Sequence, residues 1–160
     1  MGELIVEIAD MKIAKGTQTL ATYALGSCVG ICLYDEVSGI GGMLHAMLPD
    51  SRSTELIKNP YKYVDSGLKL LYRNLIRMGA DRKGLKAKLA GGAKMFEYNA
   101  VQKFSDIGTA NVVMVKQLLS LWRIPIVAEA TGGCVGRTIR FCVENGDVEV
   151  HATDGSVHTM

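Results

Sequence analysis

The chain has 160 residues, of which 48% are apolar and 21% are charged. This length and composition predict one globular domain over residues 1–160 and exclude a disordered chain. The net charge of +2 is too small to indicate a nucleic-acid partner, and no apolar run approaches the roughly 20 residues that a membrane-spanning helix needs, so we expect no membrane insertion.

The first apolar run, residues 4–8, predicts a strand. No basic segment of a secretory signal precedes it, so we expect a cytoplasmic protein. A reducing cytoplasm would keep the cysteines as free thiols, and no two of them have the C-x-x-C spacing of a zinc site. We therefore expect no disulfide and no bound metal.

Residues 29–34 predict the next strand, and residues 40–48 predict its antiparallel partner. The segment between them, 35–39, has the Asp, Ser and Gly residues of a hairpin turn. Cys28 comes just before the first of these strands, and His45 lies on the second. The hairpin therefore predicts that these two side chains approach each other.

Asn59 and Pro60 are typical of a helix start, as N-cap and first helical residue, and Gly79 is typical of the end of the same helix. Residues 106–122 predict a second helix. Its apolar face is expected to consist of Ile107, Ala110, Met114, Leu118 and Leu121.

The remaining apolar runs predict strands. Residues 85–90 lead into Gly91-Gly92, and residues 126–130 are expected to form a short buried strand. Residues 137–144 and 147–153 flank the dipeptide Asn145-Gly146, which is typical of a two-residue hairpin turn. Hairpins combined with two amphipathic helices indicate an α+β domain with mixed sheets and outer helices.

Cys28 is the main candidate for chemistry. It lies in the pattern Gly26-Ser27-Cys28-Val29-Gly30, which resembles a nucleophile elbow with cysteine in place of serine. A nucleophilic cysteine needs access and a base, and we expect its pKa to lie below the ordinary value of about 8.5. The pattern leaves open a second interpretation, in which Cys28 is a packed strand cysteine.

His45 is the nearest candidate base, but it lies in an apolar strand, where a core histidine with satisfied hydrogen bonds is also common. A catalytic histidine needs a neighbouring group that fixes its tautomer. Thr22, Ser27, Asp50 and backbone carbonyls are all candidates for this role.

Three glycine-rich segments, at Gly41-Gly42, Gly91-Gly92 and Thr131-Gly132, complete no phosphate-binding motif. We interpret them as turns or as parts of a substrate groove. Met95 and Phe96 form an apolar pair in a predicted loop, where they serve either core packing or contact with a partner.

Four segments together resemble the chemoreceptor glutamine deamidase family, CheD. They are residues 22–29 (TYALGSCV), 42–49 (GMLHAMLP), 88–96 (KLAGGAKMF) and 131–137 (TGGCVGR). The resemblance implies Cys28 as nucleophile, His45 as base and acid, and Thr22 as the residue that orients the histidine. It implies a β-sandwich flanked by helices, similar to the catalytic domains of toxins that deamidate glutamine.

The resemblance also implies the substrate and the partners. The substrates would be selected glutamines on the cytoplasmic helices of methyl-accepting chemoreceptors, and a CheC-type phosphatase would be the regulatory partner. No cofactor is required. We expect the substrate and oxyanion region at Gly26, Ser27, Gly91, Gly92, Thr131 and Gly132, and partner contacts at Met95 and Phe96. Two alternatives are a non-catalytic chemotaxis adaptor and a cysteine-type ester hydrolase.

Overall fold

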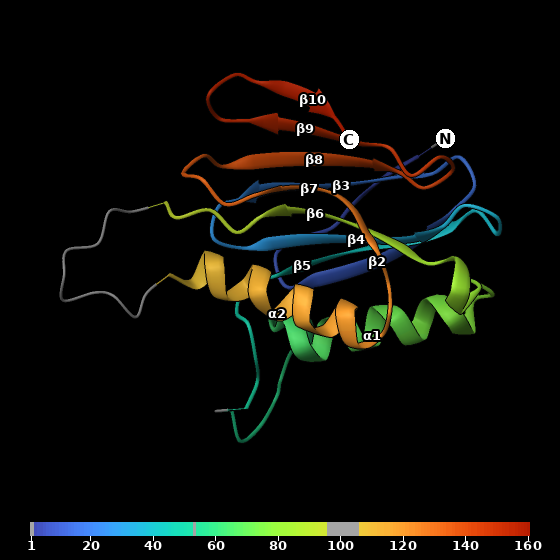
Figure 1. The fold of residues 1–160 in the computed structure, drawn as a ribbon, viewed down its shortest axis with the longest axis horizontal. Coiled ribbons are helices and arrows are strands. Elements are labelled where there is room, and N and C mark those ends of the chain that lie inside the picture. The colour runs from blue at the N-terminus through green and yellow to red at the C-terminus, as the bar shows by residue number, and fades with distance from the viewer. Residues whose placement is uncertain (1, 53, 96–105) are drawn as a thin grey trace.

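The computed structural model describes residues 2–52, 54–95 and 106–160. Two five-stranded sheets pack face to face, and both helices cover the outer face of one sheet (Figure 1). Both sheets mix parallel and antiparallel pairs, because β1 runs parallel to β3 and β6 parallel to β7. The expected α+β sandwich with helices on the outside is therefore confirmed.

The first sheet has the order β1-β3-β8-β9-β10, and the second has the order β2-β5-β4-β6-β7. The strands of the first are β1 (Glu3–Ile5), β3 (Thr19–Leu25), β8 (Arg137–Cys142), β9 (Val148–Ala152) and β10 (Val157–Thr159). Those of the second are β2 (Asp10–Lys15), β5 (Ile40–Ala46), β4 (Val29–Asp35), β6 (Lys86–Gly91) and β7 (Ile126–Thr131). The helices are α1 (Val64–Arg77) and α2 (Ile107–Leu121), with short 3₁₀ helices η1 (Pro60–Lys62) and η2 (Arg82–Gly84).

The predicted hairpin of β4 and β5 is confirmed, and it forms the centre of the molecule. Every residue of both strands is buried, because the first sheet covers one face and α1 covers the other. Gly41-Gly42 lies inside β5, so the interpretation of this pair as a turn or groove was wrong. A Cβ on Gly42 would stand 2.5 Å from Cδ1 of Leu71, so glycine there lets α1 pack closely on the sheet.

Several strand predictions need correction. The sequence did not predict β2, β3 or β10. The residues of β2 are mostly half-buried, the buried and exposed residues of β3 do not alternate, and β10 is exposed. β7 is an edge strand without a buried residue, whereas we expected a buried strand. The β8–β9 hairpin is confirmed, but residues 143–147 form a longer connection than a two-residue turn.

Both helices exist, with differences at their starts and faces. Asn59 caps η1 and not α1, since its side chain accepts from the Tyr61 N–H. On α2 the buried face is one position away from the predicted one, and Ile107 and Leu121 are exposed. The helix has a single charged residue, Lys116, so its apolar pattern does not define one face. The residues that are buried are Gly108, Asn111, Val115 and Leu119.

The protein has one core between the two sheets and another between the second sheet and the helices. Cys32 of β4 is packed in the core between the sheets, and all four cysteines are free thiols. Among the described residues, no helix is long and apolar enough to cross a membrane.

Candidate active site

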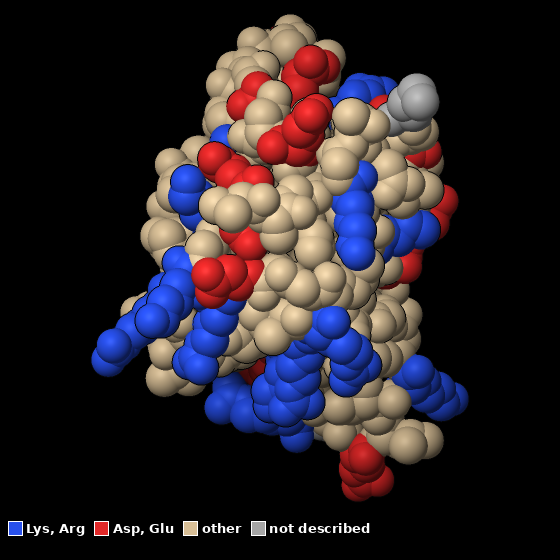
Figure 2. Space-filling view, turned by 90° about the vertical axis from the view of Figure 1, so that its right-hand side faces the viewer, with Lys and Arg blue, Asp and Glu red and all other residues tan. Residues whose placement is uncertain are grey.

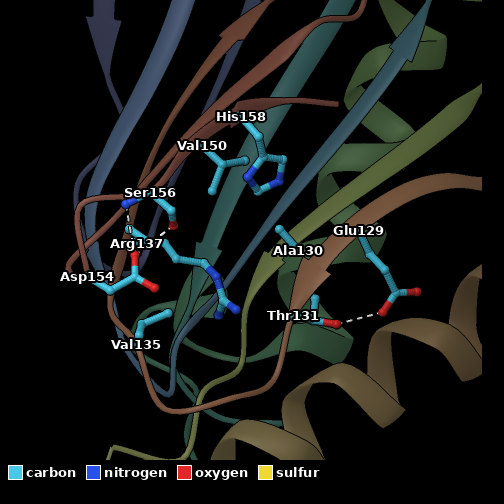
Figure 3. A pocket seen from close by; sticks show the side chains of 10 residues that line it. Glu129, Ala130, Thr131, Val135, Arg137, Val150, Asp154, Ser156 and His158 are labelled. Atoms are coloured by element: carbon cyan, nitrogen blue, oxygen red, sulfur yellow. Dashed lines mark hydrogen bonds between the residues drawn. The ribbon is translucent and has the colours of Figure 1, made fainter.

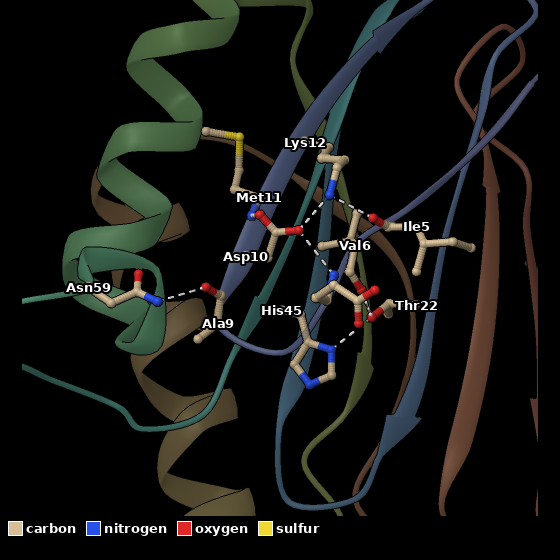
Figure 4. A network of polar contacts seen from close by, with 10 residues as sticks. Ile5, Val6, Ala9, Asp10, Met11, Lys12, Thr22, His45 and Asn59 are labelled. Carbon is tan, nitrogen blue, oxygen red and sulfur yellow. Dashed lines mark hydrogen bonds and ion pairs between the residues drawn. The ribbon is translucent and has the colours of Figure 1, made fainter.

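His45 on β5 and Thr22 on β3 meet across the sandwich, each fully buried (Figure 4). Thr22 Oγ1 donates to the Val6 carbonyl at 2.6 Å and lies 2.7 Å from His45 Nδ1. A threonine hydroxyl has one proton, which makes the hydrogen bond to the Val6 carbonyl. His45 Nδ1 therefore carries the ring proton and donates a hydrogen bond to Thr22 Oγ1, which leaves the lone pair on Nε2.

The second ring nitrogen of His45, Nε2, is buried and has no hydrogen-bond partner within the described part of the chain. Burial lowers the pKa of His45 to about 4, against the opposing influence of the Asp10 carboxylate. The imidazole is therefore neutral at pH 7. Buried polar atoms are nearly always hydrogen-bonded, so an unpaired basic nitrogen points to a functional role.

Cys28 lies in the bend that connects β3 to β4. The bend begins after a bulge in β3, where Ala24 has a φ of +59° and its carbonyl accepts from the Gly26 N–H at 3.1 Å. A positive φ is unfavourable for alanine and turns the chain out of the strand direction. The bulge thus separates buried Thr22 from half-buried Cys28 over only six residues.

The strand register relates Cys28 to His45. His45 is paired with Gly30 in the antiparallel ladder. Cys28 lies just before β4, in the bend, and its side chain packs against the core between the two sheets. His45 faces the same space, because it meets Thr22 of the other sheet there. The two side chains therefore lie on the same side of the second sheet.

No hydrogen bond joins Cys28 Sγ and His45 Nε2 in the described structure. Burial raises the pKa of Cys28, with partial compensation from its own backbone N–H. This differs from the lowered thiol pKa that we expected, because no cation among the described residues stabilises the thiolate of the half-buried sulfur. In the free protein the thiol and the imidazole are both neutral at pH 7.

One of the glycine-rich segments, Gly91-Gly92, meets the bend at Cys28. The Gly92 N–H donates to the Cys28 carbonyl at 2.8 Å, and the Ala93 N–H donates to the Gly26 carbonyl at 2.9 Å. Gly91 has a φ of +100°, and a Cβ there would stand 2.3 Å from the Cys28 carbonyl oxygen. Only glycine fits this close approach.

The segment at Thr131 and Gly132 forms the next layer outward. The Gly132 N–H donates to the Gly91 carbonyl at 3.0 Å, so Gly132 adjoins Gly91 and not Cys28. The Thr131 hydroxyl donates to Glu129 at 2.6 Å. These residues support the glycine segment behind the bend, and Thr131 directs its side chain into the adjoining cavity.

That cavity has a volume of about 390 Å³ and lies between the edge strand β7 and the strands β8 to β10 (Figure 3). Its lining includes Glu129, Thr131, Asp154 and His158. Arg137 extends from it to donate to the Gly132 carbonyl at 2.9 Å. Arg137 therefore ties the wall of the cavity to the glycine segments, a role that the sequence analysis did not assign to it.

Met95 lies over the bend and is 42% exposed. Its Cγ stands 3.0 Å from the position that a Cβ on Gly26 would occupy. The second member of the predicted apolar pair, Phe96, lies outside the described residues. The site therefore has an exposed apolar side chain directly beside the cysteine bend.

Asn111 of α2 is a polar residue near the site that the sequence analysis missed. Its Nδ2 donates to the carbonyls of Ser27, at 2.9 Å, and Met47, at 3.1 Å. Its position between apolar residues of the predicted helix could have indicated a buried polar side chain. Asn111 was missed because the predicted apolar face of α2 did not include it.

A basic region lies at the other end of the strands. Figure 2 shows Lys and Arg side chains gathered in its lower half, at the end of the molecule that carries the end of α1 and η2. There Arg73, Arg77 and Arg82 line a shallow hollow of about 380 Å³ together with Tyr72 and Ile76. This end holds the β4–β5 turn, so the basic hollow is separate from the cysteine bend.

Comparison with known proteins gives consistent results. A family model described as CheD chemotactic sensory transduction matches residues 47–152. A probable chemoreceptor glutamine deamidase CheD of Clostridium kluyveri is 46% identical over 148 residues, 92% of this chain and 91% of the relative. Proteins with the same description match from Clostridium novyi, 43% identical over 99% of this chain and 98% of the relative, and from Pyrococcus horikoshii, 46% identical over 98% and 97%.

Two solved structures share the fold at low sequence identity. The Bacillus licheniformis hypothetical protein YfiH has a TM-score of 0.52 and 15% identity over 78% of this chain and 51% of its own. A Neisseria meningitidis protein of family DUF152 has a TM-score of 0.50 and 9% identity over 81% of this chain and 64% of its own. At these identities the likeness concerns the fold alone.

Proposed function

Because the chain belongs to the CheD chemotactic sensory transduction family, we propose that it is a protein-glutamine deamidase. It converts selected glutamines of methyl-accepting chemoreceptors to glutamate, with Cys28 as nucleophile. The observation that carries the proposal is the unpaired Nε2 of neutral, buried His45, which lies on the same side of the second sheet as Cys28. The free cysteines agree with a cytoplasmic location.

In the first half of the reaction, Cys28 Sγ attacks the carbonyl carbon of the glutamine side chain. The thiol proton moves to His45 Nε2, the S–C bond forms, and the carbonyl electrons move to oxygen. Collapse of this adduct breaks the C–N bond, and the imidazolium proton goes to the departing nitrogen. Ammonia leaves, and a thioester between Cys28 and the substrate remains.

In the second half, a water molecule gives a proton to His45 Nε2 and attacks the thioester carbonyl. The C–S bond breaks, Cys28 recovers the proton, and a glutamate side chain is released. Thr22 keeps the ring in place throughout, because its oxygen accepts from Nδ1 while its hydroxyl donates to the Val6 carbonyl. Nε2 is the free basic nitrogen before it takes the proton of the thiol and again before it takes the proton of water.

The oxyanion of each tetrahedral adduct needs hydrogen-bond donors. The backbone N–H groups of Ser27 and Cys28 suit this role, since neither donates to another residue within residues 2–52, 54–95 and 106–160. The absence of a side chain on Gly26 lets Met95 pack closely beside them. Neutral thiol and imidazole groups fit a mechanism in which proton transfer accompanies the attack.

The test is incubation with a receptor cytoplasmic fragment, with glutamine-to-glutamate conversion mapped by mass spectrometry. Cys28→Ala is expected to reduce conversion to background. Cys134→Ala is the matched control, because it removes an exposed free cysteine close in the fold to the glycine segments. Conversion by Cys28→Ala at the wild-type rate would refute the nucleophile.

The same test separates the alternatives. Tight receptor binding without conversion, together with a Cys28 inert to iodoacetamide, would favour a non-catalytic adaptor. Turnover of small esters without any receptor would favour an ester hydrolase.

We also propose that the exposed Met95, with Phe96 after it, contacts the receptor helices and a CheC-type phosphatase. Its apolar side chain beside the cysteine bend supports a shared docking surface. Met95→Glu is expected to weaken both complexes, as measured by calorimetry with each partner. Unchanged affinities for both partners would remove Met95 from this surface.

A further inference from the structure

Asn111 is the buried polar residue of α2 that reaches the cysteine bend. It is fully buried, and its neighbours on the same helix face include Val115 and Leu119. The two hydrogen bonds from its Nδ2 end on carbonyls beside the site: Ser27 directly precedes Cys28, and Met47 follows His45 by two residues. One side chain from a third element thus joins the two segments that carry the proposed nucleophile and base.

The orientation of the Asn111 amide is defined by these contacts. The flipped amide would place Oδ1 against two carbonyl oxygens, which cannot donate, so Nδ2 must face them. Oδ1 then has no hydrogen-bond partner among the described residues, a property that it shares with His45 Nε2. Leucine would fill the same space but would leave the Ser27 and Met47 carbonyls without the donor that Asn111 supplies. The asparagine therefore needs a reason other than packing.

Peptide geometry supplies the reason. The Ser27 carbonyl and the Cys28 N–H belong to one planar peptide unit, and the described residues contain no cis peptide bond. In a trans peptide the C=O and the N–H point in opposite directions. When Asn111 holds the Ser27 carbonyl toward α2, the Cys28 N–H is turned away from the helix. It donates to no other residue in the described structure.

We propose that Asn111 is a positioning residue, which fixes the Ser27–Cys28 peptide so that the Cys28 N–H is preorganised as an oxyanion donor. The inference rests on the proposed deamidase function. Loss of a direct oxyanion donor slows catalysis by about 10²- to 10³-fold. Asn111 acts through a peptide that retains its N–H, so loss of Asn111 is expected to lower kcat by roughly 10- to 100-fold. KM should change much less, because the donor is used in the transition state and not in the ground state.

The variants are Asn111→Ala, which removes the amide, and Asn111→Leu, which fills the same space without a donor and guards against failure of the first to fold. Val115→Ala is the matched control, since it shortens a fully buried side chain one turn along the same face. We expect kcat to fall in both Asn111 variants and to stay at the wild-type value in Val115→Ala. An unchanged kcat in a folded Asn111 variant, or an equal fall in Val115→Ala, overturns the proposal.

A second measurement keeps the inference separate from the proposed function. In a crystal structure of the better-folded Asn111 variant, we expect the Ser27–Cys28 peptide to have rotated, with the Ser27 carbonyl directed away from α2. A peptide in the wild-type orientation overturns the positioning role. If the wild-type protein deamidates no receptor glutamine, the proposed function fails, while the peptide orientation still decides the role of Asn111.

Discussion

The two ends of the β4–β5 hairpin hold their buried polar groups in opposite ways. At the turn, the Asp35 carboxylate is buried but accepts from the N–H groups of Asp81 at 2.9 Å and Val37 at 3.2 Å. At the other end, His45 Nε2 and Asn111 Oδ1 are buried without any partner among the described residues. Asp35 and His45 belong to the two strands of one hairpin, so burial alone does not determine whether a polar group is hydrogen-bonded.

The pKa values follow the same division. Burial raises the pKa of Asp35, but the hydrogen bonds from Asp81, Ser38 and Val37 outweigh it, and the net shift is downward. At His45 burial prevails and lowers the pKa to about 4. The hydrogen-bonded Asp35 carboxylate holds the turn against the loop before η2. The neutral imidazole of His45, in contrast, keeps a basic nitrogen without a hydrogen-bond partner among the described residues. The comparison predicts that variants at the two ends affect different properties.

The largest expected effect comes from His45→Gln. General acid–base catalysis contributes roughly 10²- to 10⁴-fold, and we expect a loss of deamidation of that size with the fold retained at pH 7. Initial rates on a receptor fragment and circular dichroism measure the two properties. Wild-type activity in this variant would show that His45 is not the catalytic base. The two ends of the hairpin would then not differ in function.

The next effect is on stability against pH. The folded pKa of His45 lies below its ordinary value of 6.5, so the unfolded chain binds more protons between these values. Stability is therefore lost as the pH falls from 6.5 to about 4, by about 3 kcal/mol from this group. Denaturant unfolding of the wild type and of His45→Gln should show the difference. Parallel pH curves for the two proteins would contradict the buried neutral histidine.

Asp35→Ala is expected to cost about 2 kcal/mol of unfolding free energy, because it leaves two backbone N–H groups without their charged acceptor. The kcat of the folded variant should remain that of the wild type, since the turn lies at the far end of the strands. Chemical denaturation and rate measurements test both statements. A large loss of kcat would show that the two ends are coupled.

The smallest effect concerns Thr22. Thr22→Val keeps the shape but removes the acceptor for His45 Nδ1, so the tautomer is no longer selected. We expect kcat to fall roughly tenfold, which corresponds to about 1.4 kcal/mol of transition-state stabilisation. Thr22→Ser should retain most of the activity, because the hydroxyl is kept. Equal rates for Val and Ser at this position would assign the orienting role to another group.

Much of the site was predictable because local patterns define it. Turn residues between two apolar runs predicted the β4–β5 hairpin, and pairing of those strands places Cys28 at the end of the hairpin that carries His45. The segment at Gly91 was interpreted as a turn or as part of a substrate groove, and its close approach to the Cys28 carbonyl was not predicted. For Thr22, residue spacing left several candidates open, and the family resemblance was needed to prefer it.

Other features depend on contacts between distant segments. β3 was missed because its exposed and buried residues do not alternate around the bulge at Ala24, so the position of Thr22 opposite His45 was not visible in the pattern. The face of α2 could not be assigned from an almost uniformly apolar helix, and the role of Asn111 was missed with it. Both depend on which surfaces pack together.

The sequence by itself determined the hairpin, the cysteine bend and the family, because these follow from short-range turn chemistry and from residue identity. Only the tertiary structure decided which polar atoms are satisfied. The hydrogen bonds of His45 and Asn111 join residues that are 23 to 84 positions apart along the chain. Burial in the assembled sandwich removes water from these atoms, so their protonation and orientation are set by whichever protein groups the fold brings beside them.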